Sequence, residues 1–395
     1  MFTILSLKNG IDNVRGFYSQ GINAGLKAKD NDLAFIRSDG ICDISAVFTT
    51  NNFQAAPIKH FKRYPKAFKT NFILMNSKNA NAMTGEKGIK DIDTIIDKLK
   101  ENIPTIQNPI MSSTGVIGYR LPKEKIISAF KKFDFNSIDS NSAAKAIMTT
   151  DTFKKELCFK VILPDGKDFY IAAICKGAGM INPAMATMLC FIITDAEIPK
   201  KDMDELLQQS VKSSFDTISV DGDTSTNDTV MLLSNAKSKA YDKEAFKTVL
   251  NTLTKELSLQ ILKDAEGSNK VVAFEILNAA TKKEAKKAAT LLSNSLLVKT
   301  ALFGEDPNWG RIASTIGASG IDAEEEKLTI KYDNVTVFSK GSNKMDENIE
   351  KQALKVMQQD SFKITCDLDK GSSSYTAFGC DLSYEYVKIN ADYRT

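Results

Sequence analysis

Residues 176–190 read KGAGMINPAMATMLC, with a strand-like run at 169–175 before them and a second apolar run at 188–193. A threonine hydroxyl alone is a poor nucleophile and needs a base beside it. Breaking the Ala186–Thr187 bond would give Thr187 a free α-amino group, whose reference pKa of about 8 leaves part of it neutral near pH 7. The pattern predicts a self-cleavage site that creates a threonine nucleophile. The plainer interpretation is that residues 186–189 begin a buried strand.

The composition is that of a soluble globular protein. The chain has 395 residues, 43% hydrophobic and 26% charged, which is enough for one large domain or two. A net charge of +3, from 52 basic and 49 acidic residues, is too balanced to suggest nucleic-acid binding. No run approaches the roughly 18 apolar residues of a membrane span, and the N-terminus does not resemble a signal peptide. We therefore expect a cytoplasmic protein with no nucleic-acid or membrane partner.

Cysteine and histidine usage restricts the chemistry. The six cysteines form no CxxC pair, so we expect reduced, buried thiols. The single histidine, His60, excludes a three-histidine zinc site, and its basic neighbours suggest a solvated turn and not a member of a catalytic triad. We expect no metal, and proton transfer by a carboxylate or an N-terminal amine.

Strand-like and helical patterns are mixed, with more strand than a doubly wound fold contains. We predict strands at residues 33–36, 46–49, 72–76, 157–163, 169–175, 188–193, 229–233, 271–277, 328–332, 335–338 and 362–367, with an aromatic-rich run at 375–389. Apolar residues at helical spacing predict helices near 89–103, 203–211, 246–262, 282–298 and 349–357. The expected class is α/β (α+β), and the natural boundary is the cleavage site, which divides the chain into residues 1–186 and 187–395.

Several polar segments could carry chemistry. Thr114 and Gly115 could supply two donors to an oxyanion, or form only a tight turn. Glu266 follows a predicted helix, where a glutamate is usually exposed, and the last six residues would normally fray. Residues 221–228, DGDTSTND, open like a calcium loop, but an EF-hand needs Gly sixth and Glu twelfth, where this chain has Thr226 and Leu232.

Residues 176–189 resemble the cleavage motif of the ornithine acetyltransferases, arginine-biosynthesis enzymes also called glutamate N-acetyltransferases. The resemblance covers nearly the whole chain, because further matching segments are GINAGLK (21–27), VFTTN (47–51), NSKNANA (76–82), SVDGDTSTND (219–228) and DPNWGR (306–311). Two positions depart from the family pattern. Lys78 stands where the family usually has Gly, and Ser268-Asn269 replaces Ala-Thr after Glu266-Gly267.

The resemblance implies a self-cleaving N-terminal-nucleophile fold, a layered sandwich with stacked mixed sheets flanked by helices. Thr187 would be the nucleophile, Thr114 and Gly115 would hold the oxyanion, and either Glu266 or the Thr187 amine would move the proton. The implied substrate contacts are Thr152, Lys176, Thr187, Glu266, Asn390 and Thr395, with Thr149 and Thr150 close to the first of them. The two fragments would associate as a heterotetramer of two alpha and two beta chains.

The implied reaction moves the acetyl group of N2-acetyl-L-ornithine to L-glutamate through an acetyl-Thr187 intermediate. It needs no metal or organic cofactor, and the resemblance leaves open whether acetyl-CoA also serves as an acetyl donor. An alternative keeps the self-cleaving fold but passes the acyl group to water, as an amidase or aminopeptidase does. A third hypothesis is a non-enzymatic calcium-binding module built on residues 221–228.

Overall fold

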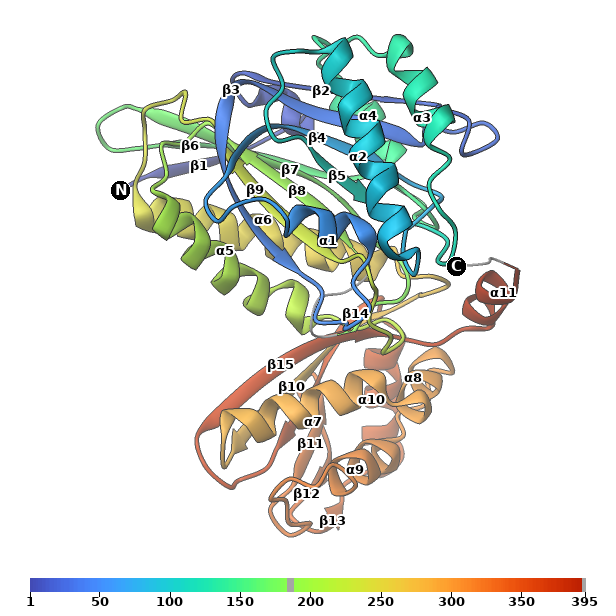
Figure 1. Ribbon diagram of the computed structural model, residues 1–395. Helices are drawn as coiled ribbons and strands as arrows, with labels where there is room; N and C mark the ends of the chain where they lie inside the picture. The colour runs from blue at the N-terminus through green and yellow to red at the C-terminus, as the bar shows by residue number, and fades with distance from the viewer. Residues whose placement is uncertain (183–187, 393–395) are drawn as a thin grey trace.

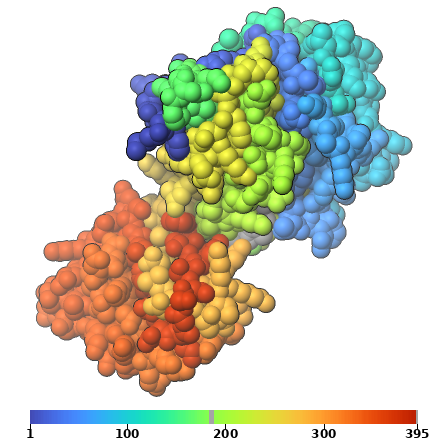
Figure 2. All heavy atoms as spheres, turned by 90° about the vertical axis from the view of Figure 1, so that its left-hand side faces the viewer, coloured from blue at the N-terminus to red at the C-terminus, as the bar shows by residue number. Residues whose placement is uncertain are grey.

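The structure is a computed structural model that describes residues 1–182 and 188–392. It has two lobes, one built on a nine-stranded sheet and the other on a six-stranded sheet (Figure 1). Figure 2 shows the lobes as two masses joined by a narrower waist. The chain passes from the first lobe to the second after residue 263, so the lobe boundary lies well beyond the predicted cleavage site.

The larger lobe contains nine strands and six α-helices among the described residues. Its sheet has the order β1-β6-β7-β8-β9-β3-β4-β5, with β2 paired to β3. The strands are β1 (Thr3–Leu7), β2 (Phe17–Ile22), β3 (Leu33–Phe48), β4 (Lys69–Asn76), β5 (Ile110–Ser113), β6 (Lys155–Ile162), β7 (Asp168–Lys176), β8 (Leu189–Thr194) and β9 (Thr229–Ser234). The helices are α1 (Ala56–Phe61), α2 (Gly85–Asn102), α3 (Lys123–Ala129), α4 (Ser140–Ala146), α5 (Lys200–Ser213) and α6 (Lys243–Lys263).

Strand β3 joins two halves of this sheet. Its first part pairs with β2 and β4, its second part pairs with β9, and the register shifts between Arg37 and Cys42. The halves share one buried core, to which β3 and β4 contribute Ile36 and Met75, and β7 and β8 contribute Ile174 and Phe191. The sheet is therefore folded onto itself as two stacked layers.

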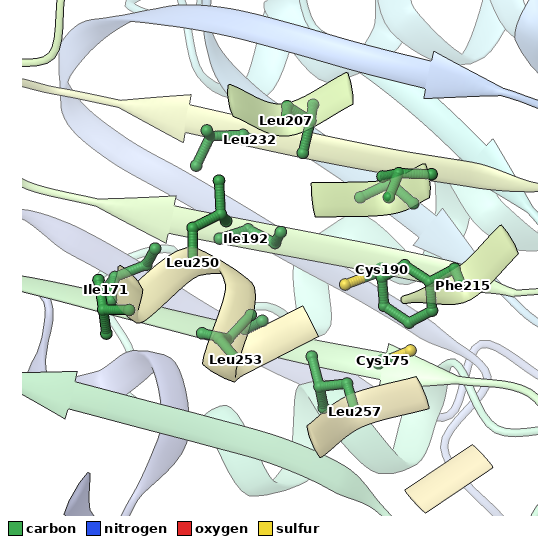
Figure 3. Packing of buried hydrophobic residues seen from close by; sticks show 14 of the residues in the cluster. Ile171, Cys175, Cys190, Ile192, Leu207, Phe215, Leu232, Leu250, Leu253 and Leu257 are labelled. Atoms are coloured by element: carbon green, nitrogen blue, oxygen red, sulfur yellow. The ribbon is translucent and has the colours of Figure 1, made fainter. Parts of the chain in front are cut away.

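Helices cover the outer face of each layer. Helix α2 packs Ile92, Ile95 and Leu99 against β3 and β4. Helices α5 and α6 pack Leu207, Leu250, Leu253 and Leu257 against β7, β8 and β9, as Figure 3 shows. Strands covered on both faces read as continuous apolar runs, as β8 does with all six of its residues buried. This helix–sheet–sheet–helix sandwich confirms the fold class expected from the sequence.

The chain segments before residue 183 and after residue 187 share this sheet. Strand β8 lies antiparallel to β7 and parallel to β9, and β9 continues the sheet to β3. Residues on both sides of the predicted cleavage site are thus part of one hydrogen-bonded ladder and one core.

The smaller lobe packs its helices on a sheet of order β13-β12-β11-β14-β10-β15. Its strands are β10 (Val271–Ala279), β11 (Thr329–Tyr332), β12 (Val335–Ser339), β13 (Ser342–Asn343), β14 (Ser361–Asp367) and β15 (Ser373–Cys380). Its helices are α7 (Lys282–Asn294), α8 (Leu296–Phe303), α9 (Trp309–Gly317) and α10 (Glu347–Met357). The predicted helix at 282–298 is divided because the Ser295 side chain accepts the Val298 N–H and caps α8, ending α7.

Two further expectations change. The predicted strand at 375–389 ends at Cys380, and the chain then forms α11 (Tyr384–Asp392), which has no buried residue. The solvated turn expected at His60 is wrong, because His60 lies buried on α1 with Nε2 3.3 Å from Oδ1 of Asp93. The expectation of buried free thiols is confirmed for all six cysteines.

Candidate active site

A cavity of about 160 Å³ brings together five of the residues predicted from the sequence: Thr114, Gly115, Lys176, Glu266 and Asn390. Thr114 follows β5, Lys176 ends β7, Glu266 lies between α6 and β10, and Asn390 lies on α11. The side chain of Asn227 ties the cavity wall together, since its Nδ2 donates to the carbonyls of Ala80 and Ser113 at 2.7 and 2.8 Å.

The turn at Thr114-Gly115 requires glycine at its second position. Gly115 has φ 128°, and a Cβ there would lie 2.2 Å from the carbonyl carbon of Lys78. The N–H of Thr114 donates to the Asn76 carbonyl at 3.0 Å, whereas among the described residues no backbone carbonyl accepts the N–H of Gly115. The Thr114 hydroxyl and the Gly115 N–H are therefore the donors that this turn can offer to a developing oxyanion.

Lys176 places a buried positive charge beside this turn. Its side chain is 2% exposed, and Nζ lies 3.4 Å from Oγ1 of Thr114. Burial alone would raise the pKa of Asp151, but the charges of Lys176 and Lys155 outweigh it and lower that pKa to about 2. Asp151 also accepts the Gly177 N–H at 2.7 Å, so this carboxylate orders the start of the glycine-rich turn.

Glu266 packs against the glycine-rich turn at residues 177–179. Its N–H donates to the Ala178 carbonyl at 3.0 Å, and a Cβ added to Gly179 would lie 2.4 Å from Oε2 of Glu266. Oε2 also accepts a hydrogen bond from Nδ2 of Asn390 at 2.8 Å. Gly179 thus leaves room for the Glu266 side chain. The sequence around either residue gives no sign of this contact.

The loop at residues 221–228 places carboxylates against Met180, Ile181 and Met188. Asp221 accepts the N–H groups of Met180 and Ile181 at 2.6 and 2.8 Å, and Asp228 accepts the Met188 N–H at 3.1 Å. In the described part of the chain, no three His, Cys, Asp or Glu side chains form a group able to hold a metal ion. The sequence pattern of this loop suggested calcium binding but gave no sign that its two terminal aspartates accept hydrogen bonds from backbone N–H groups.

Four predicted site residues remain, namely Thr152, Ala186, Thr187 and Thr395. Thr152 is not among the described residues that line the cavity, because its hydroxyl and its N–H donate to Asp264, the N–H at 3.1 Å. Thr149 and Thr150, its neighbours in sequence, do line the cavity. Ala186, Thr187 and Thr395 lie outside the described residues.

In the described residues, none of the helices combines the length and the apolar character needed to cross a bilayer.

Comparison with known proteins gives consistent matches along the chain. Residues 18–395 match the model of the ArgJ family. The arginine biosynthesis bifunctional protein ArgJ of Wolinella succinogenes is 54% identical over all of both chains. The protein of the same name from Caldanaerobacter subterraneus is 41% identical over 98% of this chain and 99% of that one.

Among solved structures, the arginine biosynthesis bifunctional protein argJ of Bacillus halodurans is similar with a TM-score of 0.48 at 34% identity. The match covers 51% of this chain and 98% of that one. Because a family model covers almost the whole chain and full-length relatives exceed 30% identity, this chain belongs to the ArgJ family.

Proposed function

We propose that this chain transfers the acetyl group of N2-acetyl-L-ornithine to L-glutamate through an ester on Thr187, which becomes N-terminal when the Ala186–Thr187 bond cleaves itself. The observation that carries the proposal is the cavity shared by Thr114, Lys176 and Glu266. Membership of the ArgJ family, whose curated relatives are named as arginine biosynthesis proteins, supports the place of this reaction in arginine biosynthesis.

The first step is the cleavage of the chain. Oγ of Thr187 attacks the carbonyl carbon of Ala186, the C–N bond breaks, and the Thr187 nitrogen takes up the hydroxyl proton and becomes an amine. Water then hydrolyses the ester, which frees the Ala186 carboxylate and the Thr187 hydroxyl. The Thr114 hydroxyl and the Gly115 N–H, which line the cavity, would bind the oxyanion that forms on the attacked carbonyl.

The second step is acetyl transfer. Oγ of Thr187 attacks the acetyl carbonyl, ornithine leaves as the free amine, and the amine of glutamate later attacks the acetyl ester and restores the hydroxyl. Lys176 suits the carboxylate that both amino acids carry, and either Glu266 or the Thr187 amine moves the proton. A covalent intermediate of this kind gives ping-pong kinetics.

The two fragments are expected to remain associated after cleavage. The fragments stay together because β8 and β9 lie between β7 and β3 in one sheet. We propose that they form a heterotetramer of two alpha and two beta chains in the cytoplasm. The reaction uses no metal or organic cofactor, and the sequence leaves open whether acetyl-CoA is a further acetyl donor.

Intact mass tests the cleavage. The 43.5 kDa chain should yield two fragments in proportion to 186 and 209 residues, with threonine at the new N-terminus. A Thr187→Ala variant should remain one species, and Thr187→Ser should cleave. A single uncleaved species from active wild-type protein contradicts the mechanism.

Acetyl transfer is tested separately, with N-acetylornithine carrying an isotope-labelled acetyl group. The label should appear on the 187–395 fragment in the absence of glutamate and move to glutamate when it is added. Release of acetate at the same rate with and without glutamate would instead identify an amidase. Acetyl-CoA labelled in the same way shows whether it is a second donor.

A further inference from the structure

Asp228 is a buried carboxyl group at the edge of the large sheet where β8 and β9 begin side by side. Its residue is 0% exposed, and Oδ1 accepts the N–H of Met188 at 3.1 Å. A backbone hydrogen bond joins the same two segments, because the N–H of Thr229 donates to the Met188 carbonyl at 3.0 Å. Met188 is covalently joined to Thr187, so Asp228 holds the peptide unit that follows the proposed nucleophile.

The second oxygen of Asp228 lacks a partner. Oδ2 is buried, and no donor in residues 1–182 or 188–392 forms a hydrogen bond to it. The nearby Thr49 hydroxyl donates to the Ser225 carbonyl at 2.6 Å. An ionised carboxylate left half-satisfied in such a place is costly, whereas a neutral carboxylic acid costs far less.

The charged groups around the cavity do not compensate a charge on Asp228. Burial raises the pKa of Asp228 well above its usual value. It outweighs the Met188 hydrogen bond, the charge of Lys176 at the end of β7, and the hydroxyls of Thr49 and Ser225, which lie near the carboxyl but form no hydrogen bond to Oδ2. The other acids bind elsewhere: Asp151 to Lys155 and the Gly177 N–H, Asp221 to the Met180 and Ile181 N–H groups, and Glu266 to Asn390.

We propose that Asp228 is a positioning residue for the self-cleavage, which acts as a neutral carboxylic acid on the N–H of Met188, the residue that follows Thr187. This inference rests on the proposed function. It adds a residue that acts on the cleavage through the backbone N–H of Met188, which is covalently joined to Thr187. A misplacement of about 1 Å at a reacting centre can cost roughly a hundredfold in rate.

Substitutions at Asp228 distinguish three roles for its side chain. If it positions Met188 as a neutral acid, an asparagine should replace it, because the amide keeps the shape, the acceptor oxygen and the lack of charge. If it must be ionised, as a base or as a counter-charge to Lys176, asparagine should fail. If it only fills space, leucine should replace it as well.

The test follows the cleavage rate of full-length precursor made by cell-free synthesis and pulse-labelled, so that maturation starts at a defined time. The variants are Asp228→Asn and Asp228→Leu, each at pH 6 to 9, with fragments resolved by mass. Asp195→Asn is the matched control, because Asp195 is equally buried with a raised pKa but follows β8 at its opposite end. Thermal melting of each precursor reports folding.

We expect Asp228→Asn to cleave within about threefold of wild type near pH 7, and Asp228→Leu to cleave at least about tenfold more slowly, the loss that one hydrogen bond of about 1.4 kcal/mol gives. Because burial raises the pKa of Asp228 well above its usual value, the rate of Asp228→Asn relative to wild type should be constant below the pH at which the wild-type group ionises and should rise above it. Dividing the rate of the variant by the wild-type rate at each pH removes the effect of all groups that titrate in both proteins. Asp195→Asn should match wild type at every pH.

Other outcomes overturn the inference in distinguishable ways. Wild-type precursor that never cleaves removes the proposed maturation, and the role of Asp228 with it. Wild type that cleaves while Asp228→Asn is slowed more than about a hundredfold at every pH shows that the carboxylate is needed. A leucine variant that cleaves at the wild-type rate shows that the Met188 contact is dispensable. If the leucine variant does not fold, the asparagine ratio alone decides between a neutral and an ionised group.

Discussion

The side-chain amide of Asn390 donates a hydrogen bond to Oε2 of Glu266, 2.8 Å away and 124 residues earlier in the chain. Helix α11, which carries Asn390, stands out from the body of the molecule (Figure 1) and buries none of its residues. Its other contact with the cavity is the Tyr386 hydroxyl, which donates to Oδ2 of Asp221 at 3.3 Å. The last helix is thus held to the site by polar bonds and little apolar packing.

Replacing Asn390 should weaken substrate binding more than it slows the chemistry. Asn390→Ala should raise the KM for acetylornithine about tenfold, the equivalent of a lost hydrogen bond. Asn390→Asp should be worse, because it sets a second carboxylate against Glu266. Steady-state kinetics measure both, with Lys388→Ala, an exposed position on the same helix, as control. An unchanged KM in both Asn390 variants would exclude Asn390 from the site.

Gly179→Ala should damage catalysis without destabilising the fold. The new Cβ would meet the Glu266 carboxyl at 2.4 Å and push that side chain out of place. We expect kcat/KM to fall by about ten- to a hundredfold with a melting temperature close to wild type. Gly317→Ala, whose Cβ would meet nothing within 4 Å, serves as control. Full activity of Gly179→Ala would show that the position of Glu266 is not critical.

Lys155 should be essential for stability. It is fully buried between Asp151, 2.8 Å away, and Asp264. Lys155→Met should lower the free energy of unfolding by about 3–5 kcal/mol, because it leaves buried carboxylates unpaired. Urea titration measures this loss. Lys160→Met, which breaks a surface pair with Asp168, should cost about 1 kcal/mol or less. Equal losses in the two variants would contradict the argument.

Ionisation of Asp195 should lower the free energy of unfolding as the pH rises from about 4 to 6. Burial raises its pKa from 3.8 to about 6, against the hydrogen bond from the Tyr170 N–H and the charge of Arg15. Between those values the folded protein holds a proton that the unfolded chain releases, so raising the pH favours unfolding, by up to about 3 kcal/mol for such a shift. Asp195→Asn should flatten that part of the profile, measured by urea unfolding at pH 4 to 7. An unchanged slope would show that Asp195 does not titrate there.

Local patterns predicted most elements but not their ends or partners. The apolar spacing at 246–262 lies within α6, and the alternation at 271–277 lies within β10. The aromatic run at 375–389 misled because residues that suit a strand up to Cys380 continue as helix α11 once the chain leaves the sheet. Strand pairing determines where the strand ends: β15 pairs with β10, whereas the residues of α11 have no neighbouring strand to pair with.

For the site, the sequence by itself predicted a self-cleavage motif, and its resemblance to a known family indicated roles for Thr114, Gly115, Lys176 and Glu266. Only the tertiary structure decided that Thr149 and Thr150 line the cavity while Thr152 binds Asp264, and that Asp228 meets Met188. The physical reason is that side-chain types and turns are local properties of the chain, which a pattern can report. Hydrogen bonds across long stretches of sequence, and the protonation of a buried acid, depend on strand register and on the loss of water, which exist only in the folded protein.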